Sequence, residues 1–199
     1  MLYNYLVGRF LLNEGSENED IGQAYDIGLL TYAGSMLNTV TTDSGMKNAM
    51  LVLGNILMVD QVRVLMKNGR KRWDIILHHI FTCGSMYHYS LFSKNIDVEF
   101  PQNITCVESV SSFPLSYHLS KKNGFLEKKA YLRKLYKISM PIIYIWRVKK
   151  TVENYWKGVC SRDSPLNKSE RIVQGICGAG LSGLNIFWLS KILMLANKK

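Results

Sequence analysis

The chain has 199 residues, enough for one domain, and 47% of them are hydrophobic, with a mean hydropathy of -0.02. These totals match an ordinary soluble protein and do not by themselves indicate a membrane protein. The net charge is +10, from 25 basic and 15 acidic residues, but the basic residues flank apolar windows, where juxtamembrane charge belongs. This placement argues against a nucleic-acid partner. The four cysteines include no CxxC pair, which argues against a zinc site or a disulfide framework, and we expect no metal and no cofactor.

The apolar residues are gathered in windows rather than spread along the chain. Residues 1–20 are a short N-terminal segment with an acidic loop, and residues 21–197 form one membrane domain. Two windows, 75–93 and 172–190, each hold 19 residues without Asp, Glu, Lys or Arg. About 20 apolar residues cross the hydrocarbon core of a bilayer. Together with weaker windows they predict about six transmembrane helices: 21–40, 46–66, 75–93, 104–119, a short core at 138–146, and 172 to about 196.

The chain shows no sustained strand-type alternation, so we predict an all-α polytopic membrane bundle. In this topology the basic stretches 67–72 and 121–134 lie on the same side of the membrane, which the positive-inside rule makes cytoplasmic. Residues 147–171 then lie on the other side, against that rule, because they hold seven Lys or Arg and only three acids. The glycine-rich window at 172–190 predicts close packing between helices.

Two adjacent histidines lie near the start of the window at 75–93. Ionisable groups inside a bilayer are rare and usually mark a site or a pathway. Asp74 lies four residues before His78 and shares its helical face, where the carboxylate can fix the tautomer of the imidazole. His78 and His79 point about 100° apart on a helix, so we expect one of them to line a cavity and the other to pack.

An Asp in one window (Asp60), the run Trp73-Asp74-Ile-Ile-Leu-His78-His79 opening the next, and Val107-Glu108-Ser109 in the following window resemble the TLC domain. The resemblance covers roughly residues 22–196. It implies about six transmembrane helices around a lipid-sized cavity, usually in the endoplasmic reticulum. In the ceramide synthases of this family the histidine pair lies at the catalytic centre, where a fatty acyl group passes from coenzyme A to a sphingoid base. Residues 102–107 lack the Asp residues of those enzymes, so the chain looks closer to the small TLC-domain proteins.

The candidate catalytic residues are His78, His79 and Glu108, and Asp60 and Asp74 are candidates to line the cavity or to orient the histidines. Each has a purely structural alternative. The histidines can tie helices together by hydrogen bonds, and Glu108 can make one interhelical hydrogen bond. Asp60 can form an ion pair within its own helix, and Asp74 can sit at a helix start or at the membrane interface.

The function we expect is lipid binding, lipid sensing or membrane lipid homeostasis by a multi-pass protein of the endoplasmic reticulum. Membrane lipids are the expected partners, and the oligomeric state stays open. The first alternative is a ceramide-synthase-like N-acyltransferase that uses acyl-CoA, with a histidine accepting the proton of the attacking amine. The second alternative is a cargo or translocation accessory, and a soluble helical bundle is the overall alternative.

Overall fold

The computed structural model describes residues 42–68, 72–93, 107, 110, 112–122, 124, 129–164 and 166–197. All regular structure in these ranges is helical and none of it is strand, which confirms the predicted all-α class there. The predicted window 21–40 lies outside the described residues, and the window 104–119 is only partly described. The elements are α3 (Asp43–Asn68), α4 (Trp73–Phe92), α6 (Ser112–Lys122), α8 (Ala130–Tyr155), the π-helical turn η2 (Trp156–Cys160) and α9 (Lys168–Asn197).

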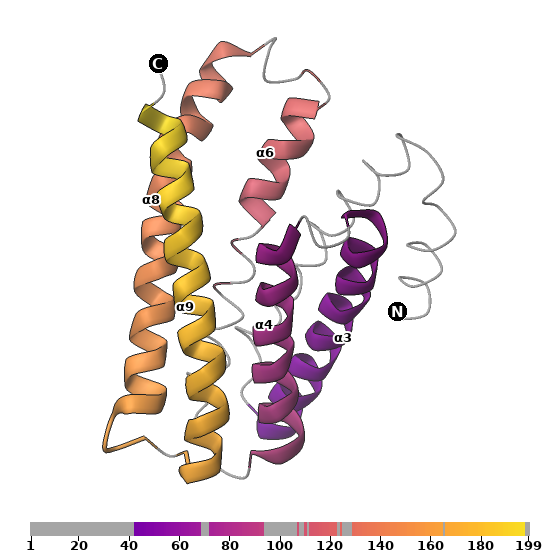
Figure 1. The fold of residues 1–199 in the computed structure, drawn as a ribbon, viewed down its shortest axis with the longest axis vertical. Helices are drawn as coiled ribbons and strands as arrows, with labels where there is room; N and C mark the ends of the chain where they lie inside the picture. Colours follow the sequence, from indigo (N-terminus) through magenta and orange to yellow (C-terminus); the bar gives the residue numbers. More distant parts are fainter. Residues whose placement is uncertain are drawn as a thin grey trace.

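The four long helices pack in the order α3, α4, α9, α8, each against the next (Figure 1). Neighbouring helices run antiparallel, as the pairing of α4 with α9 shows: Asp74 meets Trp188 and Ser85 meets Gln174. Because α4 and α8 both run against α9, the end of α3 and the starts of α4 and α8 lie at the same end of the bundle.

Helix α8 is much longer than the apolar core predicted at residues 138–146. It begins at Ala130, contains Pro141, and continues into η2, so residues 147–160 are helical and do not belong to a loop between two spans. They remain helical because Tyr144, Arg147 and Thr151, spaced three and four residues apart, continue one buried face. The segment is polar because this helix buries polar side chains.

Helix α9 starts at Lys168, a full turn before the charge-free window. The side-chain oxygen of Asn167 accepts a hydrogen bond from the backbone N–H of Glu170 at 3.0 Å. The Glu170 carboxylate in turn accepts one from the backbone N–H of Asn167 at 2.8 Å. This reciprocal capping box satisfies two amides that would otherwise lack partners, and it fixes where the helix begins.

Two glycines let the neighbouring helices approach the backbone of α9 closely. A Cβ added at Gly180 would overlap the ring of Phe81 on α4, and one added at Gly178 would lie 2.7 Å from Tyr155 at the end of α8. The close packing predicted from the glycine-rich window is therefore present at these two positions. It is not general, because a Cβ at Gly183 would meet nothing within 4 Å.

One of the described helices is long and apolar enough to cross a membrane, namely residues Lys168–Met194, which contain an 18-residue window with a mean hydropathy of 1.4. Helix α4 has the predicted length of a span, but its histidines, serines and tyrosines hold its hydropathy below that level. The apolar core is small and lies between α3 and α4. It consists of Met46, Met50, Leu53, Leu57, Cys83, Met86 and Tyr89.

Candidate functional site

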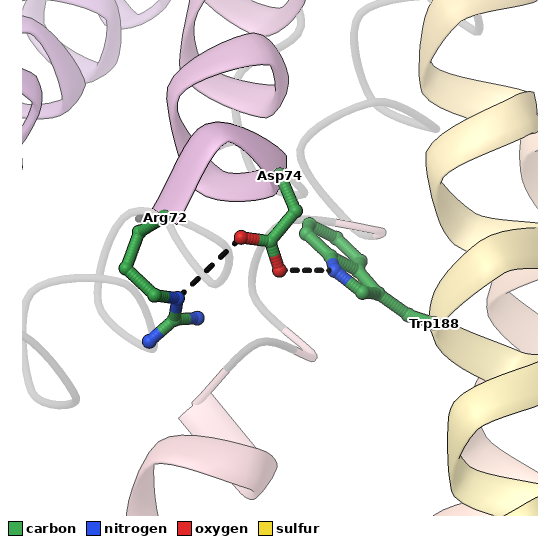
Figure 2. Close-up of polar contacts among 3 residues, drawn as sticks. All are labelled: Arg72, Asp74 and Trp188. Atoms are coloured by element: carbon green, nitrogen blue, oxygen red, sulfur yellow. Dashed lines mark hydrogen bonds and ion pairs between the residues drawn. The ribbon is translucent and has the colours of Figure 1, made fainter. Parts of the chain in front are cut away.

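Asp74 lies in the first turn of α4 and points toward α9 (Figure 2). Its carboxylate accepts a hydrogen bond from the indole N–H of Trp188 at 3.0 Å and one from Nε of Arg72 at 3.4 Å. Asp74 precedes the charge-free run at 75–93. Burial by itself would raise the pKa of its carboxyl, but the Trp188 hydrogen bond and the Arg72 charge outweigh burial and leave the pKa below its ordinary value.

His78 lies one turn further along α4 and is 6% exposed. Its ring meets the Trp188 ring edge-on, with 5.1 Å between the centroids. The structure thus places the indole of Trp188 against both Asp74 and His78. The Asp74 carboxylate bonds to Trp188 and Arg72, and the indole that it holds lies against His78.

His79 faces the opposite neighbour, α3. Its Nδ1 lies 3.0 Å from Oε1 of Gln61, and its Nε2 lies 3.5 Å from a carboxylate oxygen of Asp60. Of the two roles considered for Asp60, the contact with a histidine on the next helix is the one seen here; the side chain of Arg63 lies outside the described part. A carboxylate and an amide on the two ring nitrogens hold the imidazole in one orientation.

The two histidines therefore diverge, as their helical spacing predicted. Their ring centroids are 5.7 Å apart, but His78 packs against α9 and His79 bonds to α3. The pair ties three helices together at one level of the bundle. The same arrangement sets an imidazole beside a carboxylate, which is the geometry of a general base and its orienting group.

Arg147 is a residue of this region that sequence reasoning missed. It is 2% exposed, and its Nε donates to the side-chain oxygen of Asn185 at 2.7 Å. Asn185 donates to the hydroxyl of Thr151 at 3.1 Å, and the Arg147 guanidinium lies 5.7 Å from the centre of the Trp188 ring. The sequence places Arg147 among the charges of the polar segment 147–171. The spacing from Tyr144 to Arg147 and Thr151 was the available signal that this arginine faces inward.

A second polar contact joins α4 to α9 further from Asp74. The Ser85 hydroxyl donates to the side-chain oxygen of Gln174 at 2.5 Å, and the Gln174 amide donates to the backbone carbonyl of Ser85 at 3.1 Å. His88 lies beside this pair, with Nδ1 3.4 Å from the Gln174 nitrogen. His88 therefore belongs to an interhelical clamp and not to the histidine pair.

Glu108, the third candidate catalytic residue, lies outside the described residues. The hollow identified in the described part has a volume of about 550 Å³ and lies at the start of α9. It is lined by Leu166, Lys168, Arg171 and Ile172, so it is not the predicted cavity around the histidines. Within the same described ranges, no group of three or more His, Cys, Asp or Glu side chains is arranged to hold a metal ion.

Comparison of the chain with protein-family models, with curated proteins and with solved structures finds no match.

Proposed function

We propose that the chain is a multi-pass membrane protein of the TLC-domain type that binds or senses a lipid through the polar layer around His78 and His79. This layer comprises Asp60, Gln61, Asp74, His78, His79, Arg147, Asn185 and Trp188. The proposal places the protein in the endoplasmic reticulum and assigns it a role in membrane lipid homeostasis.

The observation that carries the proposal is the inverted distribution of polar and apolar side chains. Arg147 and Gln174 are each 2% exposed, whereas Ile142 of α8 and Ile176 of α9 are 61% and 62% exposed. Soluble proteins rarely bury arginine or expose large contiguous apolar faces. A bilayer reverses the requirement, because apolar side chains then face lipid and polar ones face the interior.

The position of the polar layer supports a role at a lipid headgroup. Trp188 and Arg147 lie level with Asp74 in the first turn of α4, although Arg147 lies in the last third of α8, and the histidines lie one turn further along α4. A headgroup at this level would meet donors and acceptors, while its chains would meet the exposed aliphatic side chains of α8 and α9. The layer therefore offers polar recognition beside an apolar surface, as lipid binding requires.

The alternative is an N-acyltransferase that moves a fatty acyl group from acyl-CoA to a sphingoid base. The contact between Asp60 and His79 favours it, because a carboxylate-supported imidazole can accept the proton of an attacking amine. The amine nitrogen would form a bond to the thioester carbon, the carbon–sulfur bond would break, and coenzyme A would leave as the thiol.

The test compares lipid composition in cells that express the wild type, the double variant His78→Ala/His79→Ala, or His88→Ala, at equal abundance. His88 is the matched control because it lies on the same helix but contacts Gln174 instead of the pair. We expect wild type and His88→Ala to change lipid composition alike, and the double variant to lose the change. A rise in ceramides would favour the acyltransferase, and equal profiles for all three proteins would refute the proposed site.

Membrane integration is tested separately by alkaline carbonate extraction of the expressed chain. An integral protein stays in the pellet, whereas a soluble bundle is released into the supernatant. Release of the wild type would refute the membrane proposal whatever the lipid profiles show.

A further inference from the structure

The hollow at the start of α9 combines a charged wall with an apolar wall. Lys168 and Arg171 contribute the cationic side, and Leu166 and Ile172 contribute the aliphatic side. The hollow is an open depression at the surface, with a volume of about 550 Å³. Lys168 is exposed, so its ammonium group is accessible to a ligand in the hollow.

Arg171 holds the wall of the hollow in place. Its Nε donates to the carbonyl of Leu166 at 3.0 Å, and one terminal nitrogen donates to the carbonyls of Ser164 at 3.0 Å and Arg162 at 3.4 Å. The guanidinium therefore anchors the segment that enters α9 and leaves a fixed positive charge at the hollow. Glu170 is 2% exposed, and its carboxylate accepts a hydrogen bond from the backbone N–H of Asn167.

The helix terminus itself is not the binding element. The capping box of Asn167 and Glu170 already occupies the first amides of α9. Recognition would come from the side chains of Lys168 and Arg171 and from the aliphatic wall. The two cationic side chains favour an anionic ligand. The apolar wall favours an anion that also carries a hydrocarbon portion.

The hollow also lies at the start of the described helix that could cross a membrane, Lys168–Met194. Ile172 is 57% exposed, and Ile176, one turn further along, is 62% exposed. A phospholipid with its phosphate at Lys168 would lay its chain along these two side chains. The positive charges of Lys168 and Arg171 attract an anionic headgroup by Coulomb interaction.

We propose that the hollow lined by Leu166, Lys168, Arg171 and Ile172 binds the phosphate headgroup of an anionic membrane phospholipid. This site is separate from the histidine pair, and the inference rests on the membrane part of the proposed function. The bound lipid would be a partner of the protein and not its substrate, because the hollow contains neither histidine.

The experiment is native mass spectrometry of the full chain in detergent, titrated with phosphatidic acid or with phosphatidylcholine. The variants are Lys168→Gln and the control Lys149→Gln, since Lys149 is a 70% exposed cation on α8 outside the hollow. We expect wild type and Lys149→Gln to bind phosphatidic acid more tightly than phosphatidylcholine. Lys168→Gln should weaken phosphatidic acid binding about five-fold, which corresponds to about 1 kcal/mol.

A parallel titration with inorganic phosphate separates a headgroup site from a free-phosphate site. Failure of phosphate to displace the lipid supports the proposal, and full displacement overturns it. Equal affinity of wild type and Lys168→Gln, or equal losses in both lysine variants, also overturns it. Carbonate extraction of Lys168→Gln distinguishes failure of the lipid-site proposal from failure of the membrane proposal. This variant should remain in the membrane pellet while losing the lipid.

Discussion

The indole N–H of Trp188 donates a hydrogen bond to the carboxylate of Asp74 at 3.0 Å, across 114 positions of the sequence. The same ring meets His78 edge-on and lies beneath the guanidinium of Arg147. Trp188 is thus the side chain through which α4, α8 and α9 meet. The geometry of His78 depends on this contact as much as on the residues next to it in sequence.

Replacing Trp188 by Phe keeps a ring between the helices but removes the donor to Asp74. Losing a hydrogen bond to a largely buried carboxylate should lower the free energy of unfolding by about 1–2 kcal/mol. The measurement is denaturant unfolding of the full chain in detergent micelles, with Trp73→Phe as the control. Trp73 is 48% exposed and contacts Phe187 through its ring, so its variant should stay near wild type. Equal stability of the two variants would contradict the role assigned to Trp188.

The approach of α4 to α9 at Gly180 makes a second prediction. Gly180→Ala puts a methyl group into the ring of Phe81 and should cost about 1–3 kcal/mol of stability, whereas Gly183→Ala has open space and should cost nothing. The same unfolding assay compares the two variants. Adding Phe81→Ala should relieve the overlap, so the double variant should lose less than the sum of the single losses. Additive losses would mean that the ring does not press on Gly180.

The local sequence pattern was enough to predict a helix such as α4, whose position follows from a run of residues without charges. The charge-free run at 75–93 begins beside Arg72 and Asp74, and the observed α4 begins within the same few residues. The contact of Asp60 with His79 was also foreseen as one of two alternatives, because consecutive antiparallel helices bring their facing residues together. In these cases the partners lie on adjacent elements of the chain.

The features that were missed depend on partners far away in sequence. From the sequence alone, Arg147 is interpreted as a charge in a loop. In the structure, Asn185 on the next long helix accepts its hydrogen bond inside the bundle. The acceptor of the Trp188 indole N–H, Asp74, likewise lies 114 positions away in the sequence. A hydropathy scale gives a charged residue the same value whether its side chain faces the bundle interior or the outside. The hydropathy pattern therefore predicted an end of α8 that is too early. No rule of spacing on one helix could have supplied these partners.

The contacts of His79 with α3 should appear as energetic coupling. His79→Ala and Gln61→Ala each break the 3.0 Å contact, so the two losses of stability should be non-additive by about 1 kcal/mol in a double-mutant cycle. A control cycle pairs His79→Ala with Gln174→Ala, which lies in the separate clamp with Ser85. That cycle should be additive within about 0.5 kcal/mol. If the first cycle is as additive as the second, His79 is not held by α3.

Arg147 provides the sharpest test of the buried polar layer. A lysine at this position keeps the charge but has no Nε donor in the plane of a guanidinium, so Arg147→Lys should weaken the hydrogen bond to Asn185 and the stacking on Trp188. We expect a loss of about 1–3 kcal/mol in the unfolding assay, since a buried charge is left poorly solvated. The matched variant Lys149→Arg changes an exposed cation two positions along the same helix and should stay within about 0.5 kcal/mol of wild type. Comparable effects from the two variants would show that Arg147 acts as a surface charge, and the inverted distribution on which the membrane proposal depends would lose its strongest member.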